Sequence, residues 1–270
     1  MMPELPEMET YRRLLTEQLR GYVITDVYIG REKSLNVSTV HFTRKVIGRT
    51  VTSIRRRAKH LIFTLDSGEH LLLHLMLGGW MFWGKEADKP DRTIQVRLDT
   101  VKGSLYFIGL RLGYLHLLDA TGLAERLHPL GPEPLQPELT MEQWLVRMAK
   151  KRGRLKLQLV NQHVIAGIGN CYADEICYEA GIRPARACPS LSENDWERLY
   201  DSIQRVLRTA IQYGGYMEQP FYTGDRLTGK YTERCQVYDR EDEPCPRCGA
   251  AIQKETSSGR KMFFCSVCQH

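Results

Sequence analysis

Four cysteines near the end of the chain have the spacing of a metal site. They form two Cys-x2-Cys pairs, Cys245 with Cys248 and Cys265 with Cys268, and sixteen residues separate the pairs. Four thiolates at this spacing are typical of one tetrahedral zinc ion with no open position, so its role would be structural. Disulfides are the alternative, which we disfavour because the opening segment has no secretory apolar core. The remaining cysteines lack such a pattern, and we expect buried thiols at Cys171, Cys177, Cys188 and Cys235.

Two clusters of cations could bind an anionic partner. The first is Arg55 to Arg57 with Lys59, and the second runs from Arg147 to Lys156 without a carboxylate. The whole chain has 38 lysines and arginines against 32 aspartates and glutamates, a net charge of +6. Either cluster alone is more typical of a solvated face, whereas two together favour phosphate contacts. Arg260 and Lys261 lie between the cysteine pairs, either as solubilising cations or on a stiff loop suited to a DNA groove.

A glycine-rich turn adds a possible anion site. Gly167 and Gly169 would let the backbone approach a ligand, and Asn170 would begin a helix whose N–H groups point at an anion. Alone the pattern is weak, because most such turns only connect helices. Together with the second cation cluster it indicates a grip on a DNA backbone.

The elements that would carry these residues differ between the two halves of the chain. Pro6 to Arg20 has helical spacing of apolar residues, and Gly21 is a plausible stop. From there to about residue 130 the period is two, with turn signals at 66–68 and 102–103, which predicts a β-sandwich or barrel. A proline-rich stretch, 130–137, then separates the strands from helical sequence.

Two capping patterns mark helices in the second half. Thr140 with Gln143 forms a capping box, and Ser192 with Asp195 begins a long amphipathic helix that runs to Gly214. After Cys235 we expect a zinc-stapled β-hairpin. The predicted fold class is α+β, with an N-terminal helix and β-sandwich at 1–130, a helix–two-turns–helix domain at 131–232 and a zinc-finger hairpin at 233–270.

Composition excludes several classes of protein. With 42% hydrophobic and 26% charged residues, the chain is neither wholly disordered nor fibrous. Its longest apolar stretch without charge, 71–84, is too short to span a bilayer. We therefore expect a soluble cytoplasmic protein that acts without a membrane.

Five motifs together resemble the formamidopyrimidine-DNA glycosylase and endonuclease VIII family of DNA repair enzymes. They are the opening residues 3–7 (Pro-Glu-Leu-Pro-Glu), Arg57-Ala-Lys59, residues 130–135, Gly167-Ile-Gly-Asn170, and the four-cysteine hairpin with Arg260. The resemblance runs end to end. It implies a bifunctional DNA glycosylase and abasic-site lyase of base excision repair, a nucleoid-associated monomer of bacterial type that binds damaged or abasic duplex DNA.

The resemblance also implies roles for individual residues. Pro3, freed by removal of methionine, would attack C1′ of a damaged nucleoside, because a terminal amine has a pKa of about 8 and is far less protonated than lysine. Glu4 would protonate the opening sugar, with Glu7 as a supporting carboxylate. Lys59 would contact phosphate and assist elimination, and Arg260 would hold phosphates and assist a second elimination. Glu4 and Glu7 could equally stabilise the helix N-terminus. The remaining expected DNA contacts are Glu7, His74, Lys151, Lys156 and Asn170.

Two departures from the family pattern affect these expectations. Met1 and Met2 both precede Pro3, and a proline nitrogen inside a peptide is not nucleophilic, so we expect the functional start at Met2. The residues that fill the gap left by the extruded nucleotide would be Leu77, Leu110 and Leu112, which form an apolar plug. Without an arginine among them we expect weak preference for the opposite base, unless Arg111 supplies the contact.

The accepted base stays open. Residues 216–230 correspond to a loop that covers the flipped purine in some relatives, but oxidised purines, ring-opened purines, oxidised pyrimidines and abasic sites all fit. Two rival functions are a lesion-binding protein without chemistry and a zinc-ribbon scaffold for protein contacts.

Overall fold

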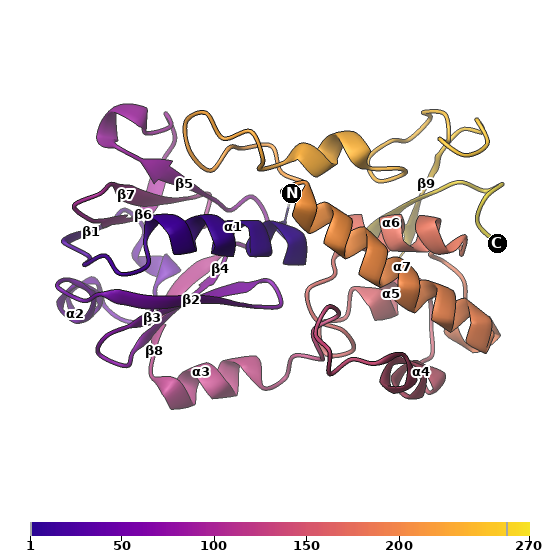
Figure 1. Cartoon of the computed structure of the whole chain (residues 1–270), viewed down its shortest axis with the longest axis horizontal. Coiled ribbons are helices and arrows are strands. Elements are labelled where there is room, and N and C mark those ends of the chain that lie inside the picture. Colours follow the sequence, from indigo (N-terminus) through magenta and orange to yellow (C-terminus); the bar gives the residue numbers. More distant parts are fainter. Residues whose placement is uncertain (1, 258) are drawn as a thin grey trace. The chain divides into compact units, whose positions relative to one another are not determined.

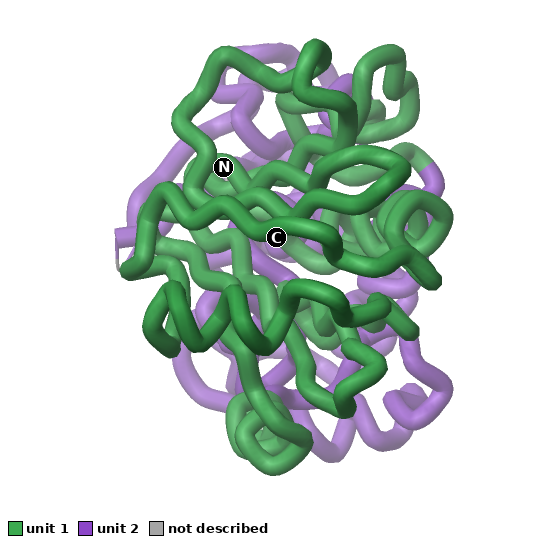
Figure 2. Tube along the Cα trace, turned by 90° about the vertical axis from the view of Figure 1, so that its left-hand side faces the viewer, with its two compact units in different colours: residues 1–129, 213–230 green, residues 130–212, 231–270 purple. Residues whose placement is uncertain are grey.

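The computed structural model describes residues 2–257 and 259–270, which fold into two compact units (Figure 2). Unit 1 comprises Met1–Pro129 and Tyr213–Lys230, and unit 2 comprises Leu130–Gln212 and Tyr231–His270. The three-domain division expected from the sequence stays a prediction. The two units are defined by packing, and unit 1 includes a segment, Tyr213–Lys230, that follows the long helix in the chain.

Unit 1 begins with helix α1 (Leu5–Gln18), which matches the helix predicted at Pro6–Arg20. Its start is fixed by Pro6 in the first turn and by a capping box, in which the Glu4 N–H donates to Glu7 Oε2 at 2.7 Å. Met8, Tyr11 and Leu15 lie on its buried face. The helix packs on strands β2 and β3, so the residues at its start are held on a rigid element (Figure 1).

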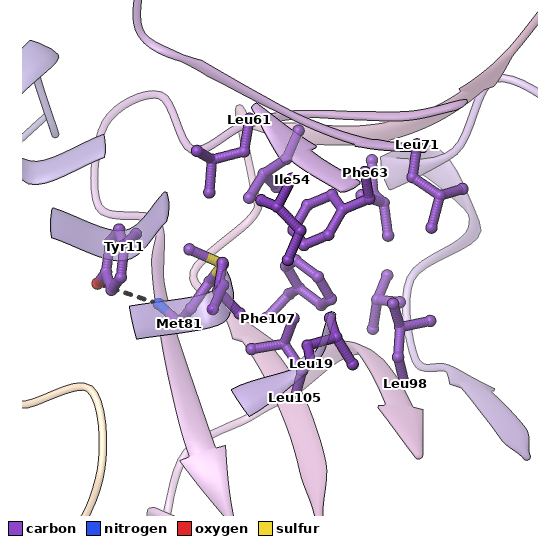
Figure 3. Close-up of a cluster of buried hydrophobic side chains, with 14 of the residues drawn as sticks. Tyr11, Leu19, Ile54, Leu61, Phe63, Leu71, Met81, Leu98, Leu105 and Phe107 are labelled. Carbon is purple, nitrogen blue, oxygen red and sulfur yellow. Dashed lines mark hydrogen bonds between the residues drawn. The ribbon is translucent and has the colours of Figure 1, made fainter. Parts of the chain in front are cut away.

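Two antiparallel four-stranded sheets form the rest of unit 1, as the period of two predicted. One has the order β1 (Asp26–Ile29), β6 (Ile94–Asp99), β7 (Ser104–Ile108), β5 (Trp80–Gly84). The other has the order β2 (Val51–Arg57), β3 (His60–Leu65), β4 (His70–His74), β8 (Tyr114–Leu118). Side chains from both sheets and from α1 share one apolar cluster, in which Met81 N–H also donates to Tyr11 Oη (Figure 3).

Short helices interrupt the region where only strands were expected. They are α2 (Thr39–Val46), capped by Ser38, and α3 (Ala120–Leu127), capped by Asp119, with 3-10 turns η1 (Glu32–Ser34) and η2 (Glu86–Asp88). Each α-helix has only eight residues. A repeat of 3.6 residues is hard to detect over so short a length.

Unit 2 contains four helices in the described residues: α4 (Met141–Ala149), α5 (Leu155–Leu159), α6 (Asn170–Ala180) and α7 (Glu193–Gln212). Both predicted caps are present, Thr140 with Gln143 and Ser192 with Asp195. The long helix α7 packs against α6, and 3-10 turns η3 (Cys188–Ser190) and η4 (Lys230–Arg234) join the elements. Strands β9 (Gln253–Ser257) and β10 (Arg260–Phe264) pair antiparallel as the expected hairpin.

The segment Tyr213–Lys230 leaves α7 and completes unit 1. Its Phe221 carbonyl accepts the Trp83 N–H at 2.6 Å, and the Phe221 ring lies edge-on to Tyr11 at 5.6 Å. It therefore lies beside the start of α1 and strand β5. Among the described residues, no helix combines the length and apolar character needed to cross a bilayer.

Candidate functional site

Pro3 lies at the wall of a small cavity in unit 1. The cavity has a volume of about 150 Å³ and is lined by Pro3, Gly78, Gly79, Trp80, Met217, Glu218 and Gln219. Three segments meet there: the chain just before α1, the turn after β4, and the segment that returns from α7. Two glycines and an indole make a wall that a flat group could lie against. Sequence reasoning did not identify Trp80, because a tryptophan in a strand is usually a core residue.

The two glutamates beside Pro3 are both buried. Glu7 accepts the Glu4 N–H through Oε2 and the Tyr216 N–H through Oε1, each at 2.7 Å. Gly215 has φ +75°, and a Cβ there would lie only 2.3 Å from Glu7 Oε1, so glycine is required. Glu7 thus joins the start of α1 to a wall of the cavity. Glu7 has 1% of its surface exposed, which leaves it almost no surface for the DNA contact expected of it.

Lys59 lies in the turn of the β2–β3 hairpin. The flanking residues Arg57 and His60 pair directly, which leaves Ala58 and Lys59 as the turn, and Ala58 has φ +53°. Arg56 braces this turn: its Nη1 donates to the Ala58 carbonyl at 3.1 Å, and its Nε contacts Glu9 Oε2 at 3.1 Å. One arginine of the first cation cluster is therefore structural.

His74 ends strand β4 among other aromatic rings. Its ring lies 4.5 Å from that of His60, and its Nδ1 accepts the Met76 N–H at 3.0 Å. Burial lowers the pKa of His74 to about 3, helped by the charge of Lys59. Its imidazole is therefore neutral at pH 7 with the proton on Nε2, so it can donate a hydrogen bond to phosphate but adds no charge.

Of the three leucines expected to form an apolar plug, two are exposed and one is buried. Leu77 and Leu112 are 59% and 63% exposed, and with Arg111 they line a cavity of about 510 Å³. Leu110 is wholly buried in the core of unit 1. Its assignment as a DNA contact is corrected, because a side chain without exposed surface cannot enter a base step.

The second cation cluster is also divided by burial. Lys156 is 1% exposed, and its Nζ lies 2.7 Å from Asp174 Oδ2. We correct its assignment as a phosphate contact, since the ammonium has no exposed surface. Lys151 is half-buried. Asn170 is the first residue of α6, and its buried Oδ1 has no partner within the described residues.

The four cysteines of the metal motif come together at the base of the β9–β10 hairpin. Their sulfurs all lie within 4.8 Å of one another, with Cys245 and Cys268 at 3.8 Å and Cys248 and Cys265 at 3.5 Å. A tetrahedral zinc with bonds of about 2.3 Å needs sulfurs about 3.8 Å apart. The set fits one structural zinc ion and leaves it no position for a substrate. As expected, the other four cysteines are buried free thiols.

Arg260 is the first residue of β10, pairs with Ser257 across the hairpin, and is exposed. Lys261 beside it is exposed as well. The hairpin thus carries Arg260 and Lys261 at the end opposite to the cysteines.

Comparisons with known proteins identify the three parts of the chain. Residues 2–114 match the formamidopyrimidine-DNA glycosylase N-terminal domain, residues 130–220 the H2TH domain of the same glycosylase, and residues 242–270 the zinc finger found in FPG and IleRS. The formamidopyrimidine-DNA glycosylase of Chloroflexus aurantiacus is 36% identical over 99% of this chain and 98% of its own length. That of Carboxydothermus hydrogenoformans is 33% identical over 99% of this chain and 100% of its own length.

Solved structures agree with the sequence matches. Lactococcus lactis Fpg, in a complex with DNA that contains an abasic site, superposes with a TM-score of 0.92 at 30% identity, over 99% of each chain. A mutant of that protein with Fapy-dG DNA gives the same score over 99% and 100%. The chain therefore belongs to the formamidopyrimidine-DNA glycosylase family.

Proposed function

We propose that this chain is a bifunctional repair enzyme, which excises a damaged base from duplex DNA and then cleaves the strand at the abasic site. The observation that carries the proposal is the cavity beside Pro3, with buried Glu4 next in the chain. Relatives with this family's name are DNA glycosylases, and solved relatives hold damaged or abasic DNA. The target nucleotide has to leave the duplex to reach such a cavity.

The proposed first step is attack of the Pro3 nitrogen on C1′ of the extruded nucleotide. The N–C1′ bond forms as the bond from C1′ to the base breaks, and the base leaves with the electron pair of that bond and takes up the proton that the Pro3 amine loses. Glu4 protonates the ring oxygen as the sugar opens, which leaves an iminium at C1′. A secondary amine reaches this cation directly.

Strand cleavage follows from the iminium. Loss of a proton from C2′ expels the 3′ phosphate, and a second elimination expels the 5′ phosphate. We assign stabilisation of these leaving phosphates to Lys59 and Arg260. Hydrolysis then releases Pro3 from the sugar fragment.

This chemistry requires Pro3 to be the first residue of the mature protein. A proline nitrogen acylated by Met2 is a tertiary amide with no lone pair for attack. We therefore propose that Met2 is removed, which is the expected processing when a small residue such as proline follows.

Covalent trapping tests the proposal. Borohydride reduces an iminium to a stable amine, so incubation with abasic-site duplex should give a protein–DNA complex that survives denaturation. Pro3→Leu should lose the complex, while Glu17→Gln, an exposed change further along α1, should retain it. Salt-sensitive DNA binding without trapping would instead support the rival function, a lesion-binding protein without chemistry.

We further propose that Leu77 and Leu112 wedge into the duplex and that Arg111 is the polar group beside them. Two leucines provide no directional contact to the opposite base, so preference for that base should be weak. Losing one base readout is worth about 1–3 kcal/mol of discrimination. Cleavage of matched duplexes that differ only in the opposite base measures this, and a strong preference for cytosine over adenine that disappears in Arg111→Ala would assign the readout to Arg111.

A further inference from the structure

Two cations of the second cluster hold the zinc hairpin from its two strands. Arg154, which immediately precedes α5, donates from Nη1 to Ser257 Oγ at the end of β9. Lys156, within α5, donates from Nζ to the Lys261 carbonyl at the start of β10, at 2.5 Å. Ser257 and Lys261 lie on either side of Arg260, so both contacts are made next to the cation that the hairpin presents.

Asp174 of α6 contacts both Lys156 and strand β10 of the hairpin. Its Oδ2 lies 2.7 Å from Lys156 Nζ and accepts the Phe263 N–H of β10 at 3.0 Å. Lys156 and Asp174 are 1% and 0% exposed. Burial raises the pKa of Asp174 to about 7, against the opposing effect of the Lys156 charge. The lysine therefore has two fixed acceptors, one carboxylate and one backbone carbonyl, and no exposed surface for a third.

A hairpin of two five-residue strands needs contacts with the rest of its unit to hold one orientation. Isolated two-stranded hairpins are marginal in water, and four of the five residues of β9 are exposed. Zinc and the apolar cluster that includes Phe263 and Tyr178 fix the end near Cys248 and Cys265, whereas Arg260 lies at the other end. The contacts of Arg154 and Lys156 restrain that other end.

We propose that Arg154 and Lys156 are positioning residues, which aim Arg260 at DNA and do not themselves bind phosphate. The inference rests on the proposed function, because Arg260 is assigned there to phosphate. The members of the second cation cluster then have two different roles. Lys150, Arg152 and Arg154 are all exposed, but Arg154 and the buried Lys156 contact the hairpin and act through it.

A double-mutant cycle of DNA affinities tests this proposal. The duplex is non-cleavable, because it carries a tetrahydrofuran in place of the abasic sugar. Arg154→Ala and Ser257→Ala should each weaken binding several-fold, and the double variant should be no weaker than either. Ser257→Ala is decisive because it breaks the contact without changing charge. Arg208→Ala, an exposed arginine of α7 that contacts Gln204, controls for loss of one positive charge.

The same changes in an Arg260→Ala background separate positioning from direct contact. If Arg154 and Lys156 act through Arg260, Arg154→Ala and Lys156→Met should have no further effect on affinity there. A direct phosphate contact predicts a further loss in that background and a salt slope lower by about 0.9 per contact, which would overturn the proposal. Lys156→Met/Asp174→Asn removes the buried pair together and serves if Lys156→Met alone does not fold.

Two further readouts make the outcome specific. Zinc content should stay at one ion per chain in every variant, which excludes collapse of the metal site. Borohydride trapping by the wild type tests the proposed function separately, because the binding cycle needs no chemistry. If the wild type is trapped but the variants do not show the expected affinities, only the positioning role is rejected. If the variants show the expected affinities but the wild type is not trapped, only the proposed chemistry is rejected.

Discussion

Two hairpins carry the cations assigned to elimination, and they are stabilised in different ways. The β2–β3 hairpin, which holds Lys59, belongs to a four-stranded sheet covered by α1. The β9–β10 hairpin, which holds Arg260, has no other strand beside it in the described chain. Sheet packing fixes the first, and Arg56, which pairs with Glu9 and donates to the Ala58 carbonyl, supports its turn. The second depends on a metal and an apolar cluster that includes Phe263 and Tyr178 at one end, and on buried polar contacts at the other.

The difference shows where a charged tip can be placed. Lys59 is 4% exposed and lies close to the core of its unit, whereas Arg260 is exposed. A hairpin embedded in a sheet can present a cation only at its own edge. A hairpin held by zinc can extend a cation into solvent, provided that something else fixes its direction.

The largest expected effect is loss of the metal. Cys265→Ser should remove zinc and unfold the β9–β10 hairpin, since zinc contributes about 10–16 kcal/mol to the folding of such small sites. DNA affinity should collapse, while unit 1, which contains no zinc ligand, should keep its fold. Metal analysis, fluorescence anisotropy and circular dichroism measure the three quantities. Retained affinity would show that the hairpin makes no contact with DNA.

A smaller effect is expected at the ion pair that supports the first hairpin. Burial alone would raise the pKa of Glu9, but the hydrogen bonds and charges of Arg12 and Arg56 outweigh it and lower that pKa below its ordinary 4.5. Glu9→Gln should therefore cost about 1.5–3 kcal/mol at pH 7, the range for hydrogen bonds to charged groups.

Because the pKa of Glu9 is lowered, its contribution to stability depends on pH. A carboxylate with a lowered pKa stabilises the fold above pH 4.5, and the contribution is lost as pH falls through the folded value. Urea unfolding should therefore show a gap between wild type and Glu9→Gln that shrinks below pH 4.5. The exposed Glu17→Gln on the same helix is the control. A gap that persists in acid would mean that Glu9 acts by packing.

The smallest expected effect is at the turn itself. Ala58 has φ +53°, a backbone conformation that costs a residue with a Cβ about 1–2 kcal/mol. Glycine avoids this cost, but its unfolded chain has more conformational entropy, which offsets part of the gain in stability. Ala58→Gly should thus stabilise unit 1 by about 0.5–1 kcal/mol. Ala124→Gly, within α3, should have the opposite sign. Thermal unfolding distinguishes the two variants.

The sequence predicted those features that local chemistry determines. The helix caps at Thr140 and Ser192, the turns at 66–68 and 102–103, and the cysteine cluster all follow from residues close together in the chain. Burial of Lys156 and Leu110 could not be predicted in this way. Within a run of cations, Lys156 differs from its neighbours only in facing Asp174, which lies eighteen residues away on another helix.

The cavity beside Pro3 was missed for the same reason. Its walls come from residues near 3, 79 and 217, and only folding brings them together. The family resemblance pointed to Pro3 and Glu4, and the structure places them just before and at the N-cap of α1. Neither the resemblance nor the residue pattern pointed to Trp80 or to the contact between Glu7 and Tyr216.

The most direct measurement is the position of the covalent bond in the borohydride-trapped complex. Proteolysis and mass spectrometry should find the reduced sugar on a peptide that begins at Pro3, with no preceding methionine. An adduct on a lysine side chain, or an unmodified amino-terminal peptide that retains Met2, would contradict the assignment of Pro3 as the nucleophile.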